Sequence, residues 1–202
     1  MDSLKGIAAS LNHALALSGL PTHSRETVRG FIGNGARVLI QRTAPKDAED
    51  ALLDTVEHAF KTDYDHAWQT GTIIYPGIID LLESLQSRGY PLAVLSNKPH
   101  PFTEAIVSQL FPSIRFSAVL GQRIGIPHKP DPAGALEISA TLRLNPENCS
   151  VIGDSTMDLE TARNAGMQAI AVTWGFHDRE QLIAAGATLI ADDPSALSVL
   201  LC

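Results

Sequence analysis

The sequence predicts an α/β fold, in which a doubly wound, mainly parallel sheet follows a helical N-terminal segment. Apolar residues recur at helical spacing over the first 70 residues. After Tyr75-Pro76-Gly77, short apolar runs of strand length alternate with helical stretches. These runs are continuously apolar, as expected of strands buried on both faces of a parallel sheet. We therefore divide the chain into a helical subdomain, residues 1–72, and an α/β core domain, residues 73–202.

The helical subdomain is expected to contain several helices and no strand. Apolar residues between Leu4 and Leu15 follow a period of about 3.6 residues, and the Ser-Gly-Leu-Pro stretch at 18–21 ends that helix. Gly33-Asn34-Gly35 interrupts the next helical stretch. Further helices are expected near Val38 and over residues 52–60.

The α/β core domain is expected to alternate strands with helices from residue 78 onward. The expected strands are Pro91–Leu95, Phe116–Leu120, Cys149–Ile152, Gln168–Val172 and a short edge strand, Thr188–Ala191. The expected helices are Ile78–Arg88, Phe102–Leu110, Pro132–Leu142, Leu159–Ala165, residues 178–185 and a last helix that begins at Pro194.

Composition and charge disfavour nucleic acid and membranes as partners and indicate a reducing compartment. The chain has 202 residues, 45% of them apolar, and a formal charge of −7, which disfavours nucleic acid or an anionic membrane as the main partner. No apolar run approaches the ~18 residues that a membrane span needs. The two cysteines, Cys149 and Cys202, form no CxxC motif, so we expect a reducing compartment, the cytoplasm. Cys149 is expected to be a small buried residue.

Polar side chains follow three successive strands. Ser96-Asn97-Lys98 follows the first, a loop with Lys129 follows the second, and Asp154 and Asp158 follow the third. Ligands of open α/β sheets bind at the carboxyl ends of the strands, so these groups are expected to converge.

The convergent groups suit a phosphate and a hard cation. Two carboxylates at a strand end are costly without a positive partner, and Mg²⁺ accepts one or two carboxylates together with waters. Lys129 can neutralise a phosphate, and Ser96 can donate a hydrogen bond to it. Each residue also has a simpler explanation: Asp158 as a helix cap, Lys129 as a solvated loop residue, and Ser96-Asn97 as turn residues.

These stretches resemble the haloacid dehalogenase-like (HAD) superfamily. SNK at 96–98, KPDP at 129–132 and GDSTMD at 153–158 look like its motifs II, III and IV. The longer stretches YPGIIDLLESLQSRGYPLAVLSNKP, FIGNGARVLIQR and GDSTMDLETARNAGM look like its phosphoglycolate phosphatases. The resemblance covers nearly the whole chain, with residues 3 to about 70 similar to the family's helical cap.

The resemblance implies a Mg²⁺-dependent phosphomonoesterase that acts on a small phosphorylated metabolite, foremost 2-phosphoglycolate, through an aspartyl-phosphate. It implies that Ser96, Asn97 and Lys129 bind the phosphoryl group. Asp154 would hold the metal, Asp158 would support the water shell of the metal or bind it directly, and the cap would close over the substrate.

One motif of the family is absent from the printed sequence. The family's first motif, DxDGTLxDS, carries both catalytic aspartates, and only Asp2-Ser3 matches its end. We expect DNA upstream of the Met1 codon to encode the rest in frame, and the chain as given to be nearly inactive. The motif's strand lies centrally in the family's sheet, so we also expect a weakened sheet whose exposed strand edges favour self-association.

Three alternatives stay open. One is a non-catalytic HAD-like protein that keeps the phosphate and metal cradle, and another is a β-phosphoglucomutase-like enzyme. A receiver-like signalling domain is disfavoured by the chain length and the helical subdomain. Arg37 is read either as a contact for a substrate carboxylate or as a solvated side chain. The histidines show no metal-ligand spacing: positions 13, 23, 58, 66, 100, 128 and 177.

Overall fold

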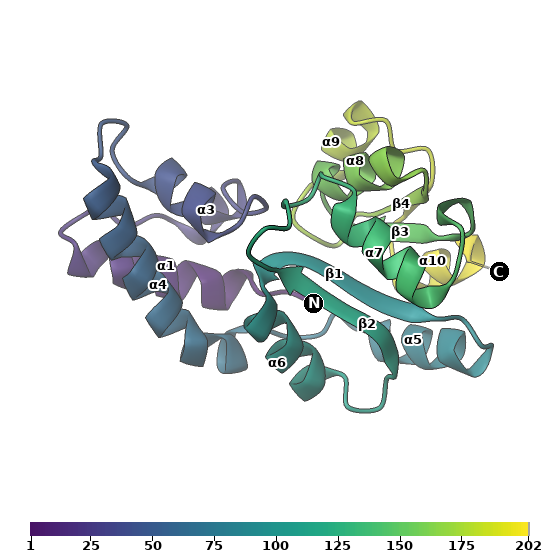
Figure 1. Cartoon of the computed structure of the whole chain (residues 1–202). Coiled ribbons are helices and arrows are strands. Elements are labelled where there is room, and N and C mark those ends of the chain that lie inside the picture. Colours follow the sequence, from purple (N-terminus) through teal and green to yellow (C-terminus); the bar gives the residue numbers. More distant parts are fainter. Residues whose placement is uncertain (202) are drawn as a thin grey trace. The chain divides into compact units, whose positions relative to one another are not determined.

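The chain folds into two compact units, Met1–Ile74 and Tyr75–Cys202 (Figure 1). A computed structural model describes residues 1–201, so Cys202 lies outside the described residues. The helical unit and the α/β unit meet in sequence at Ile74 and Tyr75.

The first unit is helical, as its apolar periodicity predicts. Its helices are α1 (Leu4–Leu17), α2 (Arg25–Arg29), α3 (Ala36–Thr43) and α4 (Asp50–Gly71). Leu11 and Leu15 of α1 and Val56 of α4 are fully buried, so the apolar stripe of each helix packs inward.

Helices α1 and α4 pack closely where two glycines meet. A Cβ atom on Gly71 would overlap the backbone of Gly6, so the helices approach at a distance that no larger residue allows. Beside this contact, Asp2 and Ile73 exchange two backbone hydrogen bonds of 2.7 and 2.9 Å in an isolated antiparallel bridge. The Asp2 side chain accepts a hydrogen bond from the Leu4 N–H at 2.9 Å, so it serves the start of α1.

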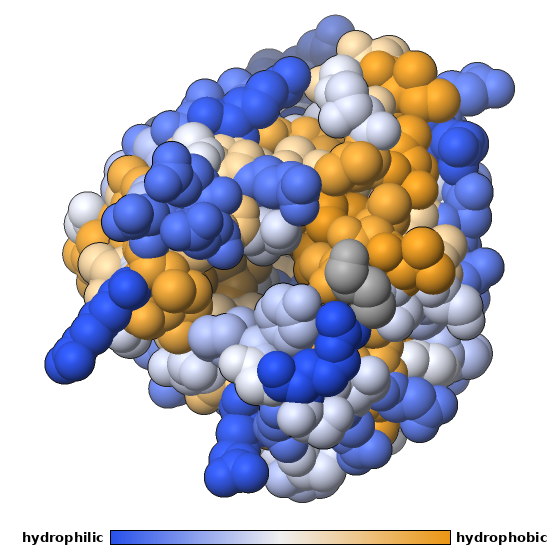
Figure 2. Space-filling view, turned by 90° about the vertical axis from the view of Figure 1, so that its right-hand side faces the viewer, coloured by the Kyte–Doolittle hydropathy of each residue, from blue (hydrophilic) through white to orange (hydrophobic). Residues whose placement is uncertain are grey.

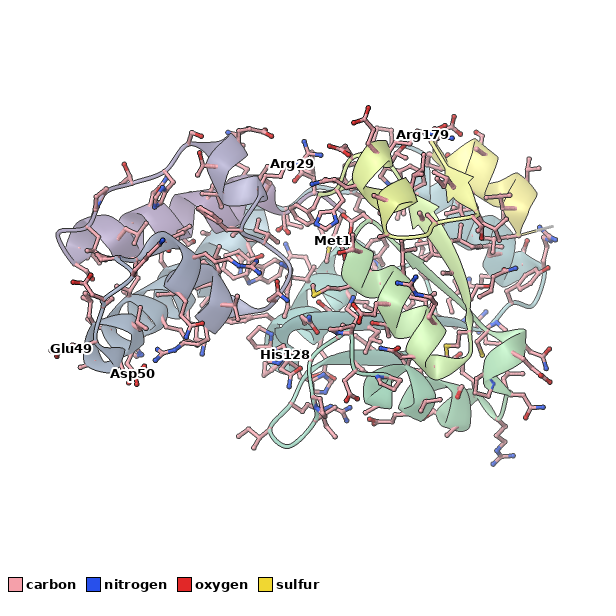
Figure 3. The ribbon with its side chains drawn as sticks, turned by 90° about the horizontal axis from the view of Figure 1, so that it is seen from above. Met1, Arg29, Glu49, Asp50, His128 and Arg179 are labelled. Carbon is pink, nitrogen blue, oxygen red and sulfur yellow. The ribbon has the colours of Figure 1, made fainter. Side chains whose placement is uncertain are left out.

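Arg37 of α3 is held by acids of α4 within this unit. Its guanidinium lies 2.8 Å from Asp50, 2.6 Å from Asp54 and 3.5 Å from Glu57. Figure 3 labels Asp50 at the N-terminal end of α4. Arg37 therefore joins α3 to α4 through ion pairs while its side chain keeps 32% of its surface exposed, and its use as a substrate contact stays a prediction.

The second unit alternates strands and helices, as expected. Its helices are α5 (Ile78–Ser87), α6 (His100–Leu110), α7 (Ala133–Leu142), a 3-10 turn η1 (Pro146–Asn148), α8 (Thr156–Ala165), α9 (Arg179–Ala184) and α10 (Pro194–Leu200). Its strands are β1 (Leu92–Pro99), β2 (Phe116–Gln122), β3 (Ser150–Gly153), β4 (Gln168–Val172) and β5 (Ile190–Ala191).

All strand pairs of this unit are parallel, but they form two sheets instead of the expected one. One sheet pairs β1 with β2, and the other has the order β3-β4-β5. Among the described residues no ladder joins β1 to β3. The expectation of a missing central strand stays a prediction. The strands beside this division are incompletely covered: every residue of β1 is only partly buried, and Ile152 of β3 keeps 42% of its surface exposed.

The three-stranded sheet is doubly wound. Ile170 and Val172 of β4 pack into a cluster with residues of α5 and α10, whereas Ala171 packs on the opposite face with Leu159 and Leu182. Successive side chains of a strand point to opposite faces, so β4 is buried on both. The core of the unit lies around this strand.

Apolar side chains also reach the surface of this unit. Figure 2 views the molecule from the right-hand side of Figure 1 and shows apolar patches between hydrophilic ones. Val199 on α10 keeps 74% of its surface exposed. Cys149, expected to be buried, is only partly so: it lies between η1 and β3, one residue before the strand begins.

Candidate active site

The first group of polar residues lies within strand β1. The sequence had indicated that this group follows the strand. Pairing with β2 continues past an irregularity to Pro99 and Gln122, so Ser96, Asn97 and Lys98 belong to the strand. The Ser96 Oγ accepts a hydrogen bond from the Lys98 N–H at 3.1 Å, while its own proton can still be donated to a ligand. The turn explanation of Ser96 is therefore wrong, because Ser96 lies within β1, and its use as a ligand contact stays a prediction.

Asn97 anchors the loop that contains Lys129. Its amide nitrogen donates to the Lys129 carbonyl at 3.1 Å, and its amide oxygen accepts from the Lys129 N–H at 2.8 Å. The side-chain amide thus pairs with the backbone of Lys129 as a neighbouring strand would. Its use in substrate binding, which the resemblance implied, stays a prediction.

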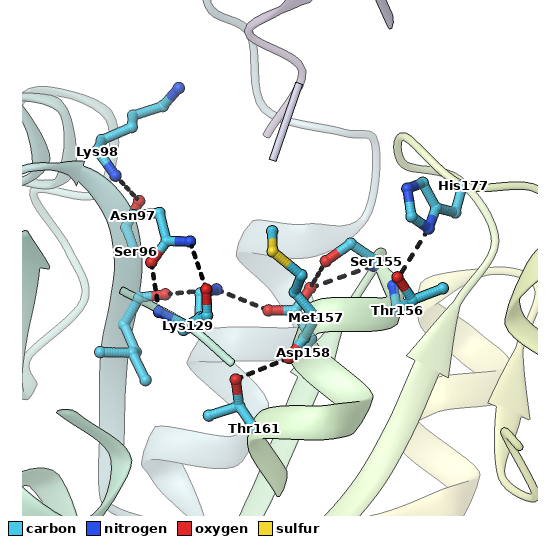
Figure 4. Close-up of polar contacts among 11 residues, drawn as sticks. Ser96, Asn97, Lys98, Lys129, Ser155, Thr156, Met157, Asp158, Thr161 and His177 are labelled. Carbon is cyan, nitrogen blue, oxygen red and sulfur yellow. Dashed lines mark hydrogen bonds and ion pairs between the residues drawn. The ribbon is translucent and has the colours of Figure 1, made fainter. Parts of the chain in front are cut away.

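Lys129 reaches across from this loop to the second group of residues (Figure 4). Its ammonium lies 2.6 Å from Asp158 Oδ1 and donates to the Leu95 carbonyl at 3.3 Å. The side chains keep only 15% and 8% of their surface exposed. Lys129 is therefore a paired, largely buried cation and not a solvated loop residue.

Asp158 caps α8 with its other oxygen. Oδ2 accepts hydrogen bonds from the Ser155 hydroxyl at 2.6 Å and the Ser155 N–H at 3.1 Å. Burial opposes ionisation of Asp158, but the Lys129 ammonium and the Ser155 donors outweigh it and hold its pKa below the usual value. A Cβ on Gly153 would overlap the Asp158 side chain, which explains the glycine at the end of β3.

Asp154 lies in a different environment. Its Oδ2 accepts a hydrogen bond from the Phe176 N–H at 2.9 Å. Burial, and next the neighbouring Asp158 carboxylate, raise the pKa of Asp154 above its usual value, against the opposing effects of the Phe176 N–H and the Lys129 ammonium. Ionised Asp154 is thus disfavoured by the described residues, and a cation beside its carboxylate would offset this.

This donor set fits a hard divalent cation that keeps most of its waters. Over residues 1–201 no cluster of three or more His, Cys, Asp or Glu side chains has metal-binding geometry. Mg²⁺ needs only one or two carboxylates from the protein, and Asp154 offers one. Both oxygens of Asp158 are already engaged, so Asp158 suits a supporting position better than a direct bond to the metal.

The expected residues come together within the second unit. Lys129 contacts Asp158 and the Leu95 carbonyl next to Ser96, and its charge acts on Asp154. Two further neighbours, Phe176 and His177, had no signal in the sequence. The His177 N–H donates to the Asp154 carbonyl at 3.1 Å. These residues follow β4 in the chain, and only the parallel pairing of β3 with β4 brings them here.

Comparisons with known proteins give a consistent result. A family model described as haloacid dehalogenase-like hydrolase matches residues 1–172. A phosphoglycolate phosphatase of Pseudomonas putida is 31% identical over 202 residues, covering 98% of this chain and 74% of that protein. A phosphoglycolate phosphatase of Psychrobacter arcticus is 30% identical over 204 residues, with 98% and 89% covered.

Solved structures show the same likeness. A crystal structure from Lactobacillus delbrueckii subsp. bulgaricus superposes with a TM-score of 0.94 at 32% identity, covering 99% of this chain and 92% of that one. A haloacid dehalogenase-like family protein from Streptococcus pneumoniae gives a TM-score of 0.88 at 27% identity, with 100% and 92% covered.

Proposed function

Because the chain belongs to the haloacid dehalogenase-like hydrolase family, we propose that this phosphatase acts with Mg²⁺ on a small phosphorylated acid, 2-phosphoglycolate. The observation that carries the proposal is the convergence of Lys129 with the Ser96 strand and the Asp154 turn. Relatives that share about 30% of the sequence over most of its length carry the name phosphoglycolate phosphatase.

The half of the site on β1 and the Lys129 loop binds the phosphoryl group in this proposal. The Ser96 hydroxyl donates to a phosphoryl oxygen, and the Lys129 ammonium balances the charge that builds up during transfer. The ammonium has three protons, so it can hold Asp158 and Leu95 O and still donate to a ligand.

The half of the site on β3 and β4 holds the metal in this proposal. Asp154 supplies the carboxylate, and Asp158 keeps Lys129 and the start of α8 in place. When bound, Mg²⁺ would neutralise the phosphate and polarise it for attack.

The printed residues do not include the Asp-x-Asp-Gly-Thr motif whose first aspartate is the family's nucleophile. We propose that residues 1–202 alone have little activity, since removing a covalent nucleophile costs on the order of 10⁶ in rate. A non-catalytic phosphate- and metal-binding function is the second candidate. The observation in its favour is that residues 1–202 do not contain the motif with the nucleophile.

A fusion experiment separates the two candidates. A strand-forming segment ending in Phe-Asp-Leu-Asp-Gly-Thr-Leu is joined to Met1, and its control carries Asn for both aspartates. Hydrolysis of 2-phosphoglycolate by the fusion with Mg²⁺, and by neither the control nor the unfused chain, is the expected result. A folded fusion that binds phosphate and metal without hydrolysing 2-phosphoglycolate or other small phosphate esters contradicts the enzyme proposal and supports the binding function.

Two lesser expectations accompany the proposal. Self-association through the unpaired edges of β1 and β3 is testable by sedimentation over a range of concentrations, and a monomer at all concentrations contradicts it. The cytoplasm is the proposed location, on the cysteine content alone. None of the described helices is both long and apolar enough to cross a membrane.

A further inference from the structure

The segment that follows β4 grips the Asp154 turn from one side. The Phe176 N–H donates to Asp154 Oδ2 at 2.9 Å, and the His177 N–H donates to the Asp154 carbonyl at 3.1 Å. Gly175 lies so close that a Cβ there would overlap the Asp154 carboxylate. Three consecutive residues therefore contact Asp154.

The ring of His177 contacts the other end of the same turn (Figure 4). Its Nδ1 lies 3.1 Å from the backbone nitrogen of Thr156, the first residue of α8. The Thr156 N–H is one of the donors that a helix leaves unpaired at its start, so Nδ1 is the acceptor. The neutral ring then carries its proton on Nε2.

His177 thus spans the turn from the Asp154 carbonyl to the Thr156 N–H with its own backbone and ring. The turn also has a cap on its inner side, where Asp158 binds Ser155. That cap fixes the start of α8 but leaves the direction of the Asp154 carboxylate undetermined. Residues 175–177 contact Asp154 directly, through two backbone hydrogen bonds and the close approach of Gly175.

We propose that His177 is a positioning residue for the metal site, which sets the orientation of the Asp154 carboxylate by holding the backbone on both sides of Ser155. The inference rests on the proposed function only in taking Asp154 as the metal ligand. Partners of metal ligands commonly contribute 10–100-fold to metal affinity when they orient the ligand.

Two amide variants separate this role from general packing. In His177→Asn the side-chain oxygen occupies the place of Nδ1 and can accept from Thr156, whereas in His177→Gln the amide extends to the place of Nε2. We expect the dissociation constant for Mn²⁺, measured by electron paramagnetic resonance on the full chain, to stay within about 2-fold for Asn. For Gln and for His177→Ala we expect it to rise about 10-fold.

Two further variants define the site. Asp154→Asn should abolish the Mn²⁺ binding, which shows that the measured ion is the one at this turn. Gly175→Ala should weaken it at least as much as His177→Ala, because the new methyl group displaces the carboxylate directly. Melting temperatures measured without metal identify any variant that fails to fold. If the alanine variants fail to fold, comparison of His177→Asn with His177→Gln still tests the proposal.

The outcomes are distinct. Equal Mn²⁺ affinity of wild type, Asn, Gln and Ala overturns the role of His177 and leaves the metal site intact. Equal loss in Asn and Gln also overturns it, because the Nδ1 contact is then not the cause. Absence of Mn²⁺ binding in the wild type overturns the proposed metal site, and the role of His177 with it.

Discussion

The two halves of the site differ in the sign of their charge and in how they are built. The half on β1 and the Lys129 loop presents a hydroxyl and an ammonium, and Asn97 holds it together through backbone contacts. The half on β3 and β4 presents two carboxylates, and donors of a helix start and a following loop hold it. The buried pair of Lys129 and Asp158 connects them. Neither half is a complete site, so the pair determines whether they act as one.

Breaking that pair is expected to have the largest effect on stability. Lys129→Met leaves Asp158 buried without its cation, and we expect the free energy of unfolding to fall by about 3–5 kcal/mol in urea titrations. Lys129→Met combined with Asp158→Asn should recover much of the loss, since the buried charge is then gone. A fall below about 1 kcal/mol in the single variant would mean that the halves do not depend on the pair.

Overfilling the carboxylate half is expected to have the next largest effect. A methyl group in Gly153→Ala overlaps Asp158, and forcing extra atoms into a packed site costs about 1–3 kcal/mol. Gly30→Ala is a matched control, because Gly30 has φ −68° and its added Cβ would lie 3.6 Å from the nearest atom. Equal urea midpoints for the two variants would contradict the close packing of Asp158 against Gly153.

Loosening the half of the site with Lys129 is expected to lower the free energy of unfolding somewhat less. Asn97→Ala removes two hydrogen bonds to the Lys129 backbone, each with a net contribution of about 0.5–1.5 kcal/mol. Asn164→Ala, which removes a single exposed bond to the Pro130 carbonyl of the same loop, should cost less. If the order of the two losses is reversed, Asn97 does not anchor the loop.

The smallest effect is expected for an exposed ion pair between the start of α9 and the residue that follows β5. The Thr173 hydroxyl, and next Arg179 at 2.7 Å, hold the pKa of Asp192 below its usual value (Figure 3). Ionised Asp192 therefore stabilises the fold above about pH 4, and this contribution is lost as the pH falls through its lowered pKa. The melting temperatures of wild type and Asp192→Asn should converge between about pH 5 and pH 3, and a difference that grows on acidification contradicts the direction of this pKa shift.

Element order and type could be predicted from the sequence, but strand ends and the division of the sheet could not. The apolar run of β1 ends at Leu95, yet the strand continues through Ser96 to Pro99 because β2 offers backbone partners. Periodicity reports which residues are apolar and says nothing about a neighbouring strand. The division into two sheets was unpredictable for the same reason, because an apolar run does not show which strands pair with each other.

For the site, the sequence predicted which residues beyond the strands would meet. It did not predict which atoms each of these side chains would contact. The position of Lys129, Asp154 and Asp158 beyond strands predicted that they would meet, because parallel strands bring their carboxyl ends to one edge. The pairing of Lys129 with Asp158 decided between two explanations that the sequence left open. His177 shows no signal, since a lone histidine 21 residues from Thr156 becomes its neighbour only in the folded sheet.

The division between β1 and β3 has a consequence for how the unit opens. Two sheets without a shared ladder need not exchange their amide protons in a single cooperative event. Deuterium should enter β1 and β2 sooner than the strand that carries Ile170 and Val172, which has neighbours on both edges and is covered on both faces. The residues proposed to bind phosphate would then lie on the part of the unit that exchanges sooner, and the turn proposed to bind the metal would lie beside the more protected part.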